Sequence, residues 1–217
     1  MVFDLSQGSS LINSYLAELR DKEIQKDRQK FRKNLERLGS IFAYEISKTL
    51  PFQIAKTNTP LGVANSHILT EQPVIATILR AGIPFYNGML DFFDKADSAF
   101  ISSHRVYSQD HSHFEIKLES LSCPSLKDRI FIVTDPMLAT GSSLVNCLEE
   151  IYKIGKPKET YIASVIASQE GINCINKSFP DIKIWVGAID QELNKFSYIV
   201  PGIGDVGDLS FGEKLQK

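Results

Sequence analysis

Short apolar runs of strand length alternate with helical segments through most of this 217-residue chain. Runs such as IFIV (130–133) and YIASVIA (161–167) lack the polar alternation of a half-exposed strand, which indicates strands buried on both faces. Helices must then cover both faces, so the pattern predicts an α/β fold with a central, mostly parallel sheet. The predicted strands are 74–79, 98–102, 129–134, 161–167 and 182–188, and the predicted helices between them are 86–94, 143–154 and 171–177.

Three other segments depart from this alternation. Residues 1–50 form an N-terminal part that is helical over 11–50, with a break near residue 22 and an end at Pro51. Its apolar stripe fits either core packing or a dimer seam, and consists of Phe31, Leu35, Leu38 and Phe42. Residues 52–69 predict a β-hairpin around an Asn-Thr-Pro-Leu-Gly turn, and residues 104–121 predict a β-arm that projects from the sheet. We expect residues 1–217 to form a single domain.

Composition excludes several classes of protein. The formal net charge is -2, so no overall positive field attracts nucleic acid or an anionic membrane. The chain starts without a secretory signal and contains no run long enough to span a bilayer, which favours a cytoplasmic location. Three widely spaced cysteines predict neither a disulfide framework nor a zinc cluster. The histidines at 104, 111 and 113 lie in a polar stretch that we interpret as a solvated loop.

The segment with the clearest chemistry is RIFIVTDPMLATGSSL, residues 129–144. A buried strand ends at Asp135, and residues 139–143 then direct backbone N–H groups, hydroxyls and a helix start at one point. Such a loop suits a phosphate group, while no lysine follows Gly141 as a Walker A loop would require. Two alternatives remain open: Asp135 as a phospho-acceptor, and an ordinary strand–turn–helix with a hydroxyl cap.

Two further segments fall at the same predicted edge of the sheet. Arg80 and Gly82 follow the strand 74–79, and a guanidinium is suited to forked contacts with phosphate oxygens. In isolation this arginine could equally be a surface residue beside a helix start. Residues 198–212, YIVPGIGDVGDLSFG, form a predicted glycine-rich loop, for which a frayed tail is the alternative.

These segments carry a family resemblance. DPMLATG (135–141) closely resembles the phosphoribosyl pyrophosphate (PRPP) motif of type I phosphoribosyltransferases in the form that uracil phosphoribosyltransferases have. LRAG (79–82) and GIGDVGD (202–208) resemble the same family in the same order, and the similarity runs from about residue 30 to the C-terminus. The resemblance implies transfer of the phosphoribosyl group of PRPP to uracil, which gives UMP and diphosphate.

The resemblance also implies roles for individual residues. Catalysis is assigned to Arg80, Arg105 and Asp205, and Mg²⁺ is expected largely on PRPP and water, with Asp205 as an indirect partner. PRPP binding is assigned to Arg80, Arg105, Asp135, Pro136, Met137, Leu138, Ala139, Thr140, Gly141, Ser142, Ser143 and Asp205. Uracil binding is assigned to Ile199, Gly204, Asp205 and Val206, within a base-recognition segment, 196–217. Residues 104–114 are the candidate lid, and DQELN (190–194) is expected to support the site.

Departures from the family pattern and rival functions remain. Ser142 replaces a usual glycine, Val206 a usual alanine and Gln169 a usual proline, and VYSQDH (106–111) replaces an acidic run. The resemblance further implies a homodimer or higher oligomer and a GTP effector. The net charge and the lack of a spanning run predict no nucleic-acid or membrane partner. The rivals are a phosphoribosyltransferase for another base and a non-catalytic nucleotide sensor or RNA-binding regulator on the same fold.

Overall fold

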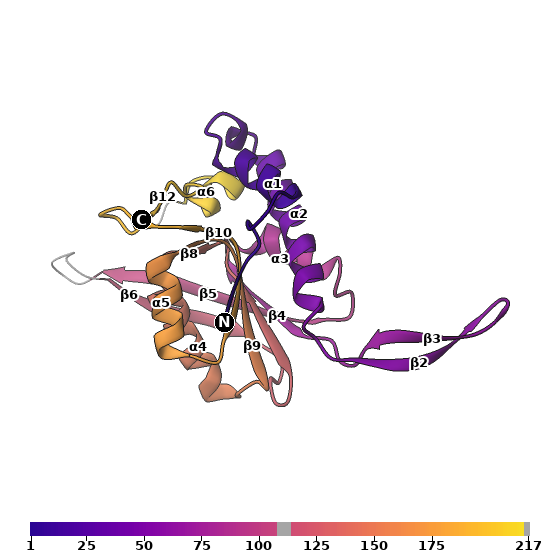
Figure 1. Ribbon diagram of the computed structural model, residues 1–217. Helices are drawn as coiled ribbons and strands as arrows, with labels where there is room; N and C mark the ends of the chain where they lie inside the picture. The colour runs from indigo at the N-terminus through magenta and orange to yellow at the C-terminus, as the bar shows by residue number, and fades with distance from the viewer. Residues whose placement is uncertain (108–113, 215–217) are drawn as a thin grey trace.

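The computed structural model describes residues 1–107 and 114–214, and all of their side chains except those of 103–107 and 114–118 (Figure 1). The main sheet is mostly parallel, as predicted, and only its last pair of strands is antiparallel. Its strand order is β1 (Val2–Asp4), β10 (Lys183–Asp190), β9 (Glu159–Ser168), β7 (Ile130–Thr134), β4 (Val74–Leu79), β5 (Asp97–Tyr107) and β6 (Phe114–Ser122). All five predicted strands are confirmed, and β5, β9 and β10 extend beyond their predicted ends.

Helices cover both faces of this sheet (Figure 1). One face packs against α1 (Leu11–Arg20), α2 (Arg28–Ser47) and α3 (Ile83–Leu90), and the other against α4 (Ser142–Ile154) and α5 (Gln169–Ser178). The predicted break near residue 22 is confirmed by a short 3-10 helix, η1 (Ile24–Lys26), between α1 and α2. Among the described residues, no helix combines the length and the apolar character that crossing a membrane requires.

The structure decides between two open alternatives for one helix and corrects two predicted helix bounds. The stripe on α2 is fully buried within the chain, so it is core packing and not a dimer seam. Helix α2 also ends at Ser47, before Pro51. Helix α3 begins at Ile83 instead of residue 86, because Pro84 stands in the first turn, where its missing N–H group has no partner to lose.

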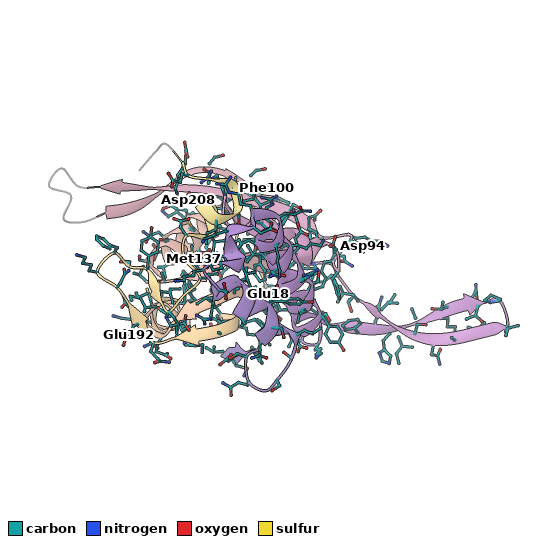
Figure 2. All side chains as sticks on the ribbon, turned by 90° about the horizontal axis from the view of Figure 1, so that it is seen from above. Glu18, Asp94, Phe100, Met137, Glu192 and Asp208 are labelled. Atoms are coloured by element: carbon teal, nitrogen blue, oxygen red, sulfur yellow. The ribbon has the colours of Figure 1, made fainter. Side chains whose placement is uncertain are left out.

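Two hairpins leave the sheet. The first pairs β2 (Phe52–Thr59) with β3 (Gly62–Leu69), as predicted, and it projects far from the rest of the chain in both views (Figures 1 and 2). The second is the outer part of β5 and β6, whose described residues pair within the range predicted for the β-arm. The first hairpin is almost wholly exposed, so it contributes little to the core of this chain.

The short elements escaped prediction. Strand β1 has three residues, and β8 (Met137–Leu138), β11 (Glu192–Leu193) and β12 (Ile199–Val200) have two each, which is too few to show a period. The predicted loop 198–212 contains a helix, α6 (Val206–Phe211). This helix has only six residues, one of them glycine, and glycine has low helix propensity. Asp205 caps its start by accepting a hydrogen bond from the Asp208 N–H group at 3.0 Å.

The strand order reverses between β4 and β7, the two central strands. From β4 the chain passes through α3 to β5, whereas from β7 it passes through α4 to β9 on the other side. Because α3 and α4 lie on opposite faces, the loops after β4 and β7 separate at their start. In open α/β sheets, ligands bind in the crevice that this separation creates. The loops concerned hold Arg80 and Asp135.

The crossing of α2 and α3 depends on glycines. A Cβ atom at Gly88 would overlap the backbone of Glu36, and one at Gly39 would overlap the carbonyl of Phe85. The Ser40 hydroxyl donates to the Gly88 carbonyl across the same contact at 3.1 Å. The helices therefore approach closely enough that neither position has room for a side chain.

We expect Gly88→Ala to lower the free energy of unfolding by about 3 kcal/mol, because backbone must move to admit the methyl group. Gly155→Ala is the matched control, since its Cβ would meet nothing within 4 Å and its backbone is extended. Chemical denaturation of both variants measures the difference. Equal stability of the two variants would contradict the close crossing.

Candidate functional site

The loop after β7 follows strand β9 before it turns into α4. The Asp135 N–H group donates to the Ala163 carbonyl at 3.1 Å, and Met137 and Leu138 pair with β9 as strand β8. The Met137 N–H group donates to Asp135 Oδ1 at 3.3 Å, and that of Leu138 donates to Ser164 Oγ at 3.1 Å. Since Pro136 has no N–H group, residues 136–138 have no free backbone donor for an anion. The available donors of the predicted cradle begin at Ala139.

The start of α4 is left open for a ligand. Gly141 is its N-cap, with φ 79°, and no side chain caps the helix. By contrast, side chains cap α1, α2, α5 and α6. Among the α-helices of the described residues, the only other one without a side-chain cap is α3, which follows Arg80. Both helices that flank the crevice present a positive dipole end. At α3 the Ile83 N–H group donates to the Arg80 carbonyl at 3.3 Å and Pro84 has no N–H group, so the donors for an anion come from the start of α4.

Helix α5 supports this loop, which the sequence reasoning missed. The Ser168 hydroxyl donates to the Ala139 carbonyl at 2.5 Å and accepts from the Gly171 N–H group at 2.8 Å. A Cβ at Gly141 would lie 2.8 Å from the Gly171 carbonyl oxygen, and one at Gly171 would lie 2.8 Å from the Leu138 carbonyl oxygen. Backbone therefore packs directly on backbone here. The SQEG run (168–171) was the available signal.

The departure at Ser142 is accommodated. Ser142 is the first residue of α4, so it has ordinary helical angles that any residue adopts. Its hydroxyl lies 2.8 Å from that of Thr140, and either group can donate. The positive φ angle in the loop belongs to Gly141 alone, and the second glycine of the family pattern is not required for this conformation.

Arg80 follows the end of β4 and lies beside the C-terminal segment, and the Leu79–Arg80 peptide is cis. Its Nη2 donates to Asp208 Oδ1 at 3.1 Å and to the Gly212 carbonyl at 3.2 Å. A Cβ built on Gly207 would lie 3.3 Å from Asp205 Oδ1 and 3.9 Å from Arg80 Nη2. The predicted catalytic residues Arg80 and Asp205 are thus both within 4 Å of one point, although they are far apart in sequence.

The rest of that segment lies over the same edge of the sheet (Figure 1). Ile199 and Val206 are buried in the core cluster that also takes in Met137 and Ala139 from the other loop. The β-branched side chain of Val206 is therefore packed into the core. Gly204 is exposed, with φ 80°. The segments that the resemblance joins are brought together at one edge.

A buried ion pair anchors the segment. Arg20 on α1 donates from Nη1 and Nη2 to the two carboxylate oxygens of Asp190, each at 2.8 Å. The same arginine donates to the Gly202 carbonyl at 3.0 Å, and Asp190 Oδ2 accepts from the Gly202 N–H group at 2.9 Å. Burial would raise the pKa of Asp190, but the hydrogen bonds from Arg20 and Gly202 outweigh it, so the pKa is lowered. Asp190 thus supports the segment, as its motif predicted.

Asn194 of the same motif shapes the turn before β12. Its Oδ1 accepts from the backbone N–H groups of Phe196 at 2.9 Å and Tyr198 at 3.0 Å. Its own N–H group donates to the Tyr198 carbonyl at 2.9 Å. The motif residues that the resemblance names, Asp190 and Asn194, therefore hold two successive turns of the base-recognition segment.

Two predicted features cannot be placed from side chains. Arg105 lies on β5 opposite Ile116 of β6, and its side chain is outside those described. The candidate lid 104–114 includes residues 108–113, which lie outside the described residues. The assignments of Arg105 and of the lid stay predictions.

Two cavities lie elsewhere. One of about 460 Å³ lies between the N-terminal loop and α2, and is lined by residues 4–12 with Ile41 and Glu45. One of about 360 Å³ lies between residues 121–127 and the end of α4. Neither contains a residue that the motifs single out. No group of three or more potential metal-ligating His, Cys, Asp or Glu side chains occurs in the part of the chain that the structure describes.

Comparison with known proteins agrees with this geometry. The family model of uracil phosphoribosyltransferase matches residues 6–213. The uracil phosphoribosyltransferase of Porphyromonas gingivalis is 46% identical over 215 residues, which cover 99% of both proteins. That of Pyrococcus furiosus is 41% identical over 213 residues, which cover 97% of this chain and 90% of that protein. The solved structure of the AQ2163 protein from Aquifex aeolicus superposes with a TM-score of 0.87 at 32% identity, covering 99% of this chain and all of that one.

The ionisation of Asp135 gives a testable pH dependence. Desolvation raises the pKa of Asp135 to about 6, and the hydrogen bond from the Met137 N–H group offsets this only in part. Ribose hydroxyls donate hydrogen bonds best to the ionised carboxylate, so the predicted ligand PRPP should bind that form. Affinity should therefore fall as pH drops below 6, by about tenfold at pH 5.

Calorimetric titration of PRPP between pH 5 and 8 measures this dependence. Asp135→Asn is the control, because protonation of the ligand's own phosphates affects both proteins equally. The affinity of the wild type should fall more steeply with acid than that of the variant. Parallel profiles would show that Asp135 does not contact the ligand.

Proposed function

We propose that this chain, which belongs to the uracil phosphoribosyltransferase family, transfers the 5-phosphoribosyl group of PRPP to uracil, giving UMP and diphosphate. Residues 1–217 would act as one phosphoribosyltransferase domain in pyrimidine salvage. The observation that carries the proposal is the meeting of Arg80 and Asp205 at the edge where the uncapped start of α4 also lies. Two anion-binding elements and a base-recognition segment then border one crevice.

In the reaction, N1 of uracil forms a bond to C1 of the ribose while the bond from C1 to diphosphate breaks. The N1 proton leaves, and negative charge grows on the departing diphosphate. The protein's contribution is to align the reactants and to stabilise that charge. Arg80 supports this role because its Nη1 and Nε groups donate to no residue among those described, which leaves them available to phosphate oxygens.

The loop 139–143 is proposed to hold the 5′-phosphate. Its free N–H groups, the hydroxyls of Thr140, Ser142 and Ser143, and the start of α4 supply the donors. Asp135 would accept hydrogen bonds from the ribose hydroxyls, and Arg105 would share the diphosphate with Arg80. This division places the sugar between the loops that follow β4 and β7.

The donor set suits Mg²⁺ held mostly by the substrate. Asp205 Oδ1 caps α6, while Oδ2 accepts no hydrogen bond from any residue among those described, so one carboxylate oxygen remains for the ion or its water. A single protein carboxylate combined with substrate oxygens and water is the usual arrangement for this ion. When bound, the ion would neutralise charge on the diphosphate. Asp205 would orient that group within the crevice.

Uracil is proposed to bind the main chain of the base-recognition segment. Both polar backbone groups of Gly202 are occupied by Asp190 and Arg20, so the groups free for O2, O4 and N3–H belong to residues on either side. Ile199, Gly204 and Val206 stand there. Because the Gly202 contacts hold the backbone in place, the base would meet a preformed edge that penalises analogues lacking one polar group.

The hairpin β2–β3 supports the proposal of a homodimer or higher oligomer. Phe52, Ile54 and Val63 point to one face of this hairpin, by the strand register, and all three are exposed. A two-stranded hairpin is at best marginally stable alone in water. The three apolar side chains therefore suit burial against a second copy of the chain, on a face that they share with Lys56, Asn58, Asn65 and His67. The GTP effector and the cytoplasmic location stay predictions.

An assay with radiolabelled uracil, PRPP and Mg²⁺ tests the proposed reaction, and parallel runs with GTP test the effector. We expect UMP to form. Asp205→Ala should lower turnover by at least about 100-fold, because the carboxylate proposed to hold the ion, and through it to orient the diphosphate, is lost. Circular dichroism should show a folded variant. Cytosine, orotate, hypoxanthine and adenine should be poor acceptors. Near-normal turnover of Asp205→Ala would count against the assigned site.

Sedimentation analysis tests the hairpin. Ile54→Lys should shift the protein towards smaller species, because it places a charge on the proposed interface. Ile154→Lys is the matched control, since Ile154 is also exposed but lies at the end of α4. An unchanged sedimentation coefficient for Ile54→Lys would exclude this face as the interface.

A further inference from the structure

We propose that Asp208 is a positioning residue that orients the Arg80 guanidinium for diphosphate and ties that orientation to the base-recognition segment. The proposal rests on the proposed function and adds a residue to which the motifs gave no role. It concerns the contact between the turn after β4 and helix α6, whose position Figure 2 marks with Asp208.

Asp208 and Gly212 occupy one nitrogen of the guanidinium, and the other two have no acceptor among the described residues. Both acceptors, Asp208 Oδ1 at 3.1 Å and the Gly212 carbonyl at 3.2 Å, bind Nη2. A guanidinium is planar, so fixing Nη2 from two sides sets the plane in which Nη1 and Nε point. Nη1 and Nε, each of which can donate to a phosphate oxygen, are then oriented before the substrate arrives.

Asp208 is itself held by its own segment and by α2. The Asp208 N–H group donates to Asp205 Oδ1 at 3.0 Å, and Arg32 Nη1 donates to the Ser210 carbonyl at 2.7 Å. Leu209, the next residue, packs against the core cluster. Helix α6 is therefore held near both ends by residues that do not belong to the turn after β4. The C-terminal segment therefore fixes the position of Asp208, and Asp208 in turn orients the Arg80 side chain.

The Arg80–Asp208 pair is partly exposed to water, which indicates that it orients Arg80 more than it stabilises the fold. The side chain of Arg80 is 38% exposed and that of Asp208 is 31% exposed. Ion pairs with this much access to water contribute little to folding. The Arg20–Asp190 pair, whose carboxylate is 8% exposed, is the one that anchors the segment. Loss of Asp208 should therefore leave the segment folded and release only Arg80.

The two products of the reaction distinguish a role of Asp208 in orienting Arg80 from a role in supporting the base-recognition segment. Diphosphate would bind at Arg80, whereas UMP carries the 5′-phosphate, the ribose and the base without the diphosphate. We expect Asp208→Ala to weaken diphosphate and PRPP binding by about tenfold, the loss typical of a hydrogen bond to a charged group. UMP binding should stay within about twofold of wild type. Asp208→Asn keeps an acceptor oxygen and should fall between.

The measurement is calorimetry with each ligand on variants of the full chain, alongside steady-state assays that separate the KM for PRPP from the KM for uracil. Asp97→Ala is the matched control. It removes an exposed aspartate from another arginine pair, Arg129 Nη1 to Asp97 Oδ2 at 2.9 Å, where β5 begins at the opposite edge of the sheet. This variant should bind both ligands as the wild type does.

Three results would overturn the proposal. Equal loss of UMP and diphosphate binding would make Asp208 a support of the whole segment. Tighter diphosphate binding would show that Asp208 holds Arg80 away from the ligand. Unchanged binding of both ligands would show that the orientation of Arg80 does not depend on Asp208. UMP synthesis by the wild type is measured first, so failure of the proposed function is recognised separately.

Discussion

The reversal of strand order between β4 and β7 is the constraint on which the candidate site depends. The chain leaves these neighbouring strands toward opposite faces of the sheet. Helices α3 and α4 therefore follow adjacent strands but lie in different layers. Neither helix has a side-chain cap, so both direct a positive dipole end at the crevice. Because of this one topological feature, the Arg80 turn and the loop after Asp135 border the same crevice.

Closing the third side of the crevice requires the C-terminal segment, which has little structure of its own. Its order comes from contacts with remote parts of the chain, namely Arg20 on α1, Arg32 on α2 and Arg80 after β4. Three arginines thus bind carbonyl groups of one glycine-rich stretch. The physical consequence is that the proposed uracil and diphosphate positions share a support.

Much of the fold was predictable, for reasons visible in particular elements. The run 130–133 is buried on both faces, so its lack of alternation predicted β7, and the stripe at Phe31 and Leu35 predicted α2. Helix α6 was not predictable, because GDVGD has low helix propensity and its helical form depends on the Asp205 cap and on packing. The support from Ser168 and Gly171 was also missed, since backbone contact between distant segments leaves no periodic signal.

The sequence alone determined the α/β class, the motifs and their order, because burial patterns and local loop chemistry are written in neighbouring residues. Its family resemblance also assigned roles to Arg80, Asp135, Gly141 and Asp205. Only the tertiary structure decided which of their groups are free: the N–H groups of residues 137 and 138 are paired, and Arg80 already meets Asp208. Such pairings join residues up to 182 positions apart, as in Arg20 with Gly202, and they depend on how the layers pack and not on any local pattern.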